Sequence, residues 1–114
     1  MKARGEARLW IAQRATAVVL ALCITVHLVT IVYAVRNGLD AAHVLARTRS
    51  NYAWAAFYCI FVAAAAIHGA IGLRTVAAEW LRFRGAVADR VMVAIAIVLA
   101  FAGLVAVAAV VGAP

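Results

Sequence analysis

Charged residues divide the chain into three long apolar runs. No Lys, Arg, Asp or Glu occurs within 15–35, 50–73 or 91–114, which are runs of 21, 24 and 24 residues. About 20 apolar residues are enough to cross a bilayer as a helix. The runs are continuous rather than alternating and are rich in alanine, which favours helices over membrane strands. The prediction is an all-α membrane protein with one domain, residues 1–114, and transmembrane helices at about 15–36, 51–74 and 91–112.

Composition agrees with this class. The chain has 114 residues, of which 69% are hydrophobic and 13% charged. A soluble domain of this length buries only about 65% of the surface that its unfolded chain exposes. Such a domain would leave too much apolar surface in water, so a soluble fold is excluded.

Basic residues predict the orientation in the membrane. Eight basic residues precede the first run or lie between the second and third runs: Lys2, Arg4, Arg8, Arg14, Arg74, Arg82, Arg84 and Arg90. Three lie in the loop between the first and second runs: Arg36, Arg47 and Arg49. The positive-inside rule then puts the N-terminus and the second loop on the cytoplasmic side of a cytoplasmic (inner) membrane. The net charge of +7 is mostly this topology signal and also favours anionic lipid, without a nucleic-acid partner.

The connecting segments carry weaker signals. Residues 1–14 are expected to contain a helix at the membrane interface, anchored by Trp10. Asn37-Gly38 predicts a turn, after which Asp40 is expected to cap a short helix.

Residues 74–90 have an amphipathic pattern that separates two groups of side chains. Val76, Trp80 and Phe83 are expected to enter the membrane. Glu79, Arg82 and Arg84 are expected to face outward. Both cysteines, Cys23 and Cys59, lie in apolar runs and are interpreted as buried structural thiols.

Two histidines are the ionisable residues inside the apolar runs, where such a residue is a functional candidate. They are His27 and His68. Neutral imidazole is a common metal ligand and a usual axial ligand of haem iron. Ala64 and Gly72, four residues on either side of His68, leave room for a flat macrocycle. The same small side chains also suit close helix packing around a buried, hydrogen-bonded histidine.

The expected depths of the two histidines differ. His27 lies about 20 Å beyond Arg14 along a helix, and His68 about 9 Å before Arg74. If both arginines mark one interface, the histidines differ in depth by about 10 Å, so they are not expected to bind one haem within one chain. Each then needs a partner histidine from another chain. A bond to a neighbouring helix is the other interpretation of His27, and His43 is expected to be solvated.

The run "HGAIGLRTVAAEW" resembles the second-helix motif of succinate dehydrogenase and fumarate reductase membrane-anchor (cytochrome b) subunits. There a haem-ligating histidine is followed by glycine, arginine and an acidic residue, places that here hold His68, Gly72, Arg74 and Glu79. The acidic residue is more usually aspartate. Upstream, "QRATAVVLA" resembles the start of the family's first helix, where an arginine lies near quinone and haem propionates; Arg14 takes that place.

Two further positions, Trp10 and His27, can be compared with the corresponding positions in different members of that family. A serine usually stands four residues before the first-helix arginine in ubiquinone-reducing members, and here that place holds Trp10. Anchors with two haems use first-helix histidines for the distal haem and second-helix histidines for the proximal one. The resemblance therefore implies His68 and His27 as axial ligands, with Trp10, Gln13, Arg14 and Arg74 near haem propionates or quinone.

The resemblance also implies partners and a function. The chain would be a non-catalytic subunit that binds one or two haems b, shared with a second anchor chain that completes the helical bundle. Iron–sulfur and flavoprotein subunits would dock on the cytoplasmic side, at Glu79, Arg82 and Arg84, and exchange electrons with membrane quinone.

Other classes remain open from the sequence. A haemless anchor of the same family would only dock its partners and bind quinone. A small multidrug exporter has a similar length, but it needs a fourth helix and an intramembrane glutamate. A small pore-forming protein fits three helices but leaves the motif around His68 unexplained.

Overall fold

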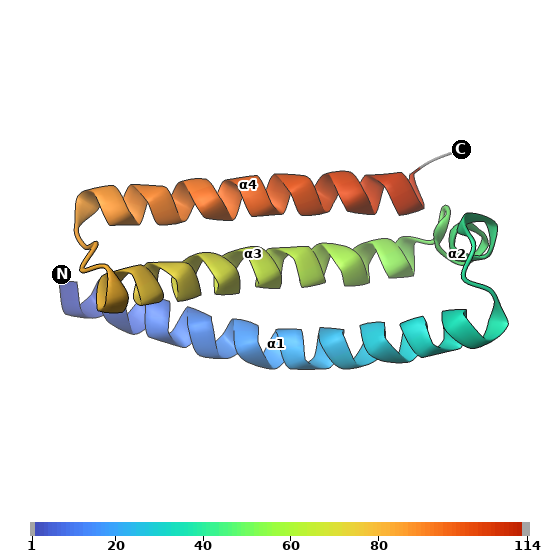
Figure 1. The fold of residues 1–114 in the computed structure, drawn as a ribbon, viewed down its shortest axis with the longest axis horizontal. Helices are drawn as coiled ribbons and strands as arrows, with labels where there is room; N and C mark the ends of the chain where they lie inside the picture. Colours follow the sequence, from blue (N-terminus) through green and yellow to red (C-terminus); the bar gives the residue numbers. More distant parts are fainter. Residues whose placement is uncertain (1, 113–114) are drawn as a thin grey trace.

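A computed structural model describes residues 2–112 and is helical nearly throughout. The helices are α1 (Lys2–Asn37), α2 (Ala41–Thr48), α3 (Tyr52–Trp80) and α4 (Ala86–Val111) (Figure 1). Of these, α1, α3 and α4 are long and apolar enough to cross a membrane. The predicted all-α fold with three membrane-spanning helices is confirmed.

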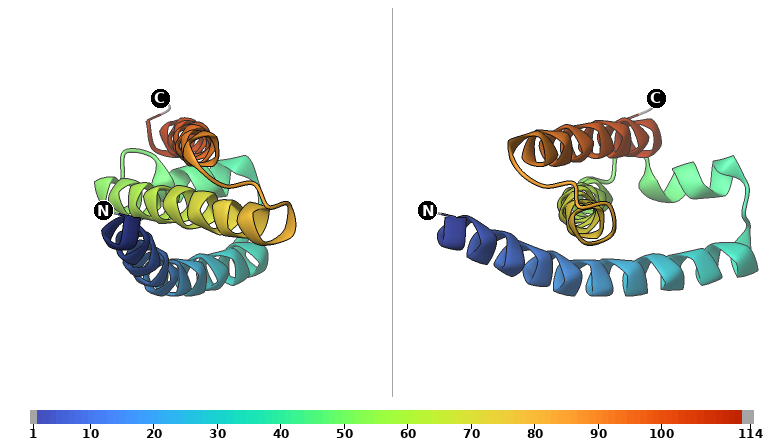
Figure 2. Two further views of the ribbon diagram at one scale, coloured as in Figure 1. Left: turned by 90° about the vertical axis from the view of Figure 1, so that its left-hand side faces the viewer. Right: turned by 60° about the vertical axis from the view of Figure 1, so that its left-hand side comes forward.

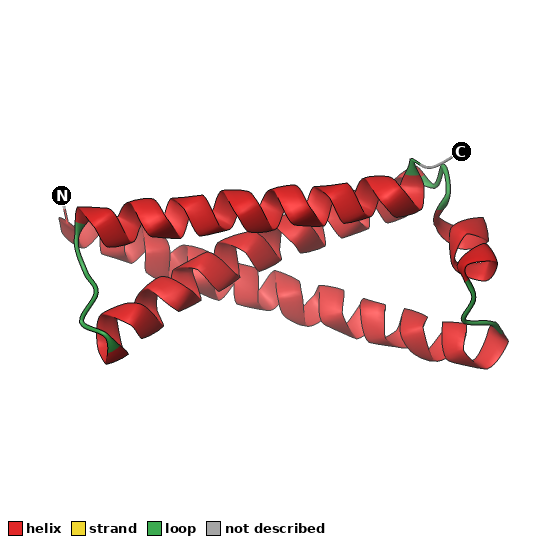
Figure 3. Cartoon of the chain, turned by 45° about the horizontal axis from the view of Figure 1, so that its top comes forward, coloured by secondary structure: helices red, strands yellow, loops and turns green. Residues whose placement is uncertain are grey.

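The long helices are arranged with α3 in the middle. It packs against α1 on one side and α4 on the other, whereas α1 and α4 have no extensive contact with each other in the described part of the chain (Figure 1). Figure 2 shows α1 bowed along its length, and Figure 3 shows the long helices crossing obliquely. Because α3 touches both neighbours, it determines which residues of α1 and α4 meet other helices.

Small side chains make up most of the buried core. The buried apolar residues are Cys23, Ala34, Ala64, Ala66, Ala70, Ile71, Ala88, Val107 and Val111. Most large apolar side chains point away from the chain instead, as expected where lipid or a partner helix covers them. Cys23 is buried as predicted. The same prediction is wrong for Cys59, which is exposed because it lies on a face of α3 that neither α1 nor α4 covers.

The helices extend beyond the predicted bounds at the basic end of the molecule. Residues 2–14 are the first turns of α1, not a separate interfacial helix. The amphipathic segment 74–90 is divided between the end of α3, a short loop and the start of α4. Charged residues mark where the apolar zone ends, but Arg, Glu and Lys are good helix formers, so the helices continue past them.

The loop at the opposite end follows the predicted turn and cap. Gly38 has φ +129°, where a Cβ would meet the His43 ring at 2.9 Å. The carboxylate of Asp40 caps α2 by accepting from the backbone N–H of His43, and this bond lowers the Asp40 pKa. Buried Thr48 donates to the carbonyl of Val110 at 2.8 Å, which attaches α2 to the end of α4.

The contact between α3 and α4 requires glycine at position 103. A Cβ there would lie 2.5 Å from Cγ1 of Val62, whereas a Cβ at Gly69 would meet only Leu99, at 3.7 Å. We expect Gly103→Ala to destabilise the fold by about 1–3 kcal/mol through overpacking. Gly69→Ala should be neutral or slightly stabilising, because alanine favours helix. Thermal unfolding of the purified protein in detergent measures both.

The double variant Val62→Ala/Gly103→Ala provides the control, because it removes the methyl groups that the new Cβ would meet. It should recover part of the lost stability. If Gly103→Ala is as stable as Gly69→Ala, the close α3–α4 contact is contradicted.

Candidate functional site

His68 lies in α3, is half-buried and faces α1. Its Nδ1 atom is 3.2 Å from the hydroxyl oxygen of Thr16. That hydroxyl also lies 2.7 Å from the carbonyl oxygen of Ala12, one turn earlier in α1. The histidine predicted as a ligand therefore has a hydrogen-bonding neighbour on the adjacent helix.

A groove of about 730 Å³ lies between α1 and α3 near His68. Trp10, Gln13 and Arg14 line it from α1, and Gly72 and Arg74 line it from α3. All four residues predicted near propionates or quinone therefore share one groove. His68 lies one helical turn deeper than Gly72 on the same face of α3, just beyond the groove.

Two polar groups of the groove have unused bonding capacity. The side-chain oxygen of Gln13 is buried and has no hydrogen-bond partner among residues 2–112. The Arg14 guanidinium lies over the Trp10 ring, 5.0 Å from its centre. Within residues 2–112, no carboxylate pairs with Arg14. The groove thus offers a cation on α1 to a ligand with oxygen atoms, and an amide oxygen that can accept a hydrogen bond from a ligand hydroxyl.

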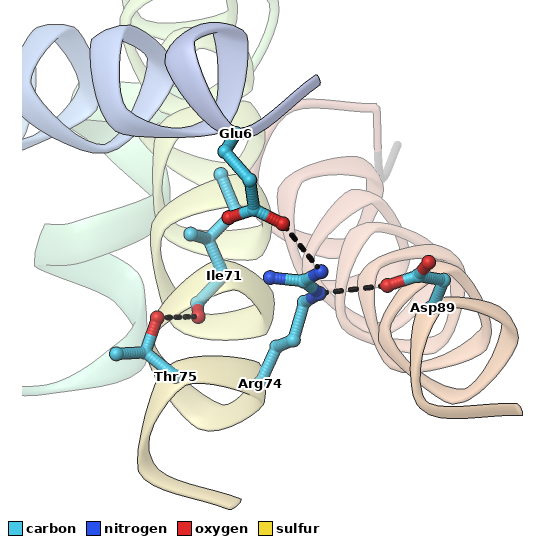
Figure 4. A network of polar contacts seen from close by, with 5 residues as sticks. All are labelled: Glu6, Ile71, Arg74, Thr75 and Asp89. Atoms are coloured by element: carbon cyan, nitrogen blue, oxygen red, sulfur yellow. Dashed lines mark hydrogen bonds and ion pairs between the residues drawn. The ribbon is translucent and has the colours of Figure 1, made fainter. Parts of the chain in front are cut away.

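The second arginine of the groove already has acidic partners (Figure 4). Nε of Arg74 donates to Asp89 of α4 at 2.8 Å, and Nη2 donates to Glu6 of α1 at 3.1 Å. Arg74 itself belongs to α3, so this ion cluster connects all three long helices at their basic end. The side chain of Arg74 is only 20% exposed, whereas the side chains of Glu6 and Asp89 are more than half exposed.

His27 faces α3 at a different level, among aromatic rings. Its ring makes edge contacts with Tyr58 and Phe61, at centroid distances of 6.0 and 5.6 Å. Trp54 and Phe57 extend this aromatic cluster. The Nδ1 atom of His27 is buried without a hydrogen-bond partner in the described residues. The bond to a neighbouring helix that would explain His27 as a packing residue is therefore not found at this nitrogen.

The two histidines are further apart in depth than the arginines suggested. Thr16, which lies beside His68, and His27 are eleven residues apart in α1. At 1.5 Å per residue this is about 16 Å, against the 10 Å expected. The difference arises because Arg74 lies opposite Glu6 and not opposite Arg14. This separation agrees with the expectation that the two histidines do not bind one haem within one chain.

The predicted docking residues lie at the basic end of the molecule. Glu79 is exposed at the end of α3, and Arg82 is exposed in the following loop with φ +53°. Arg84 is exposed too, and its Nε donates to the carbonyl of Ala78 at 3.3 Å. These residues are available at the surface, although the Arg84 side chain bends back to cap α3.

Three features of the site were not predicted from the sequence. Thr16 as the neighbour of His68 is one, and the carboxylates Glu6 and Asp89 on Arg74 are another. The third is Arg47, whose guanidinium lies over Tyr33 and whose Nε is buried without a partner in residues 2–112. A stripe of side chains at spacings of three and four along α1, polar or small except for Leu20, would have indicated that Thr16 faces another helix, although not that it meets His68: Gln13, Thr16, Leu20, Cys23, His27, Thr30 and Ala34.

Metal ligation by this chain alone is not indicated. Within residues 2–112, no three His, Cys, Asp or Glu side chains are grouped so as to hold a metal ion. A haem requires less from one chain, because its porphyrin supplies four nitrogen ligands and the protein supplies only axial ones.

Comparison with known proteins identifies the family. The family model described as succinate dehydrogenase/fumarate reductase transmembrane subunit matches residues 1–110. The chain belongs to this family. No curated protein and no solved structure matches the chain significantly.

Membership in the succinate dehydrogenase/fumarate reductase transmembrane subunits agrees with the geometry. It makes the chain a multi-pass membrane protein that associates with other subunits of such a complex. The match also favours an anchor over the exporter and pore-forming interpretations, since it extends over nearly the whole chain.

The ion cluster around Arg74 makes a prediction for this anchor subunit. Arg74→Gln removes both ion pairs and leaves Glu6 and Asp89 without their cation. We expect a lower unfolding temperature, with each pair contributing about 1 kcal/mol or less because the carboxylates are exposed to screening. Added salt should reduce the difference from the wild type. Thermal unfolding in detergent at two salt concentrations measures both effects.

Arg90→Gln is the matched control, since it removes an exposed arginine of α4 for which the structure describes no ion pair within residues 2–112. Equal destabilisation by Arg74→Gln and Arg90→Gln would show that the cluster does not hold the helices together.

Proposed function

We propose that this subunit is a haem b-binding membrane anchor of a succinate:quinone oxidoreductase. It lies in the cytoplasmic (inner) membrane with its N-terminus on the cytoplasmic side, and a second anchor chain completes its helical bundle. It docks the iron–sulfur and flavoprotein subunits and provides an electron path between them and membrane quinone. The subunit itself converts no substrate.

The observation that carries this proposal is the groove beside His68 in a chain of this family. A membrane-embedded imidazole, an arginine without a described acidic partner and an unpaired amide oxygen lie within about three turns of each other on α1 and α3. Haem carboxylates and quinone oxygens both accept hydrogen bonds, and arginine binds carboxylates through its planar fork. The amide oxygen of Gln13 is itself an acceptor, so it would take a hydrogen bond from the hydroxyl of a protonated propionate or of a quinol. These residues fit either ligand.

Each residue then has a defined role. His68 would hold the iron of a proximal haem, and His27, at the other depth, would hold that of a distal one. Arg14, with Trp10 beneath it and Gln13 beside it, binds a propionate or a quinone oxygen. Arg74 lies at the mouth of the same groove, where Glu6 and Asp89 fix its position. Haem b supplies a one-electron ferric–ferrous couple when bound.

Docking is assigned to the basic end of the helices. Glu79, Arg82 and Arg84 are exposed there, and Lys2 of α1 lines the same pocket as Glu79 and Arg84. A cationic surface at the membrane edge attracts an acidic partner surface and accelerates its association. The iron–sulfur subunit is the partner expected to contact it, with the flavoprotein subunit beyond.

A haemless anchor is the second candidate. The hydrogen-bonding contact of His68 with Thr16 favours it, because a histidine with a neighbour of this kind also suits simple helix packing. In that case the groove would bind quinone alone, and the chain would dock its partners without an iron site.

The proposal predicts that His68→Ala removes one b-type haem from the purified complex, and that His27→Ala removes the other where two are present. Each substitution removes the imidazole that this subunit would provide to one haem iron. Succinate oxidation by the soluble subunits with an artificial acceptor should persist. The pyridine haemochrome assay, together with flavin quantification, measures the change.

His43→Ala is the matched control, because this histidine is exposed on α2, in the connection between α1 and α3, and is bonded to Asp40. It should retain all haem. A His68→Ala complex with full haem content would remove His68 as a ligand.

A further inference from the structure

Thr16 has one hydroxyl proton and three hydrogen-bonding neighbours. Its oxygen is 2.7 Å from the carbonyl of Ala12, 3.1 Å from the carbonyl of Gln13 and 3.2 Å from Nδ1 of His68. A hydroxyl donates one hydrogen bond and accepts through two lone pairs, whereas a carbonyl only accepts. The shortest contact therefore takes the proton, and the hydroxyl oxygen faces His68 as an acceptor.

We propose that Thr16 is a positioning residue for His68. Its hydroxyl accepts the Nδ1–H of the imidazole, so the ring carries its proton on Nδ1 and presents the lone pair on Nε2. This inference rests on the proposed function, because a free Nε2 matters only if His68 is a ligand. Hydrogen bonding at the other ring nitrogen selects the tautomer of a metal-binding histidine, fixes its orientation and raises its basicity.

Few other side chains near His68 could accept a hydrogen bond from its Nδ1–H. Gly72, one turn from His68, has no side chain, and a Cβ there would face the Gln13 amide at 3.5 Å. Ala64, one turn in the other direction, is buried and apolar. Within the described residues, the Thr16 hydroxyl is the one side-chain hydrogen-bonding neighbour of His68.

Removing this acceptor should change the haem in a defined direction. An imidazole whose N–H is hydrogen-bonded donates more electron density and stabilises ferric over ferrous iron. In the isosteric variant Thr16→Val, the N–H faces a methyl group, so the midpoint potential should rise. A tenfold loss of ferric preference corresponds to about 59 mV for one electron. Haem affinity should fall about 10- to 100-fold.

Three variants of the full complex distinguish orientation from packing. Thr16→Ser retains the hydroxyl and should restore the wild-type potential. Thr25→Val is the matched control, because Thr25 donates to the carbonyl of Ala21 at 2.8 Å in the same helix and, within the described residues, forms no hydrogen bond with a histidine. Redox titration followed by visible spectroscopy, with haem content by haemochrome, measures all of them.

The outcomes separate this inference from the function on which it rests. A raised potential or lost haem in Thr16→Val, with Thr16→Ser and Thr25→Val unchanged, supports it. An unchanged Thr16→Val complex overturns it while leaving His68 a ligand. A Thr16→Val complex that alone fails to assemble also overturns it, because the hydroxyl is then needed for folding. A wild-type complex without haem overturns the proposed function together with the inference.

Discussion

The contact between α1 and α3 is the interaction on which the rest of the structure depends. A polar side chain on a membrane-spanning helix is costly in lipid unless it faces another helix or a cavity. In this chain the half-buried polar stripe of α1, from Gln13 through Thr16 to His27, faces α3. The pairing of Thr16 with His68 near one end of the stripe, and of His27 with Tyr58 and Phe61 further along, defines one antiparallel register. That register places the groove with Arg14 and Arg74 at the basic end.

The small residues of α3 and the ion cluster of Arg74 support this register in different ways. Ala64, Ala66 and Ala70 let the backbones approach closely, and Gly103 does the same on the α4 side. Arg74 then connects α3 to both neighbours outside the apolar zone. Large apolar side chains lie on the outer surface, where lipid or partner helices would cover them. A subunit built in this way is stable as part of an assembly and has little core of its own.

Much of the fold was predictable because the membrane restricts it strongly. Uncharged runs such as 50–73 identify the spanning helices directly, and Asn37-Gly38-Leu39-Asp40 identified the turn and the cap. Helix ends were not predictable, because arginine and glutamate are compatible with helix on either side of the interface. The groove residues were suggested by family resemblance and are adjacent in the structure. Thr16 was missed because its relation to His68 depends on the register between two helices, which no local pattern contains. Glu6 and Asp89 were missed for the same reason, since each is far from Arg74 in sequence.

Haem binding by an imidazole at membrane depth is most directly tested by a dithionite-reduced minus oxidised spectrum of the purified wild-type complex, with haem and flavin quantified on the same sample. We expect the bands of b-type haem, with two haems per flavin if both His27 and His68 are ligands and one if only His68 is. A complex that contains flavin but no haem would contradict this expectation and leave the chain a docking and quinone-binding anchor.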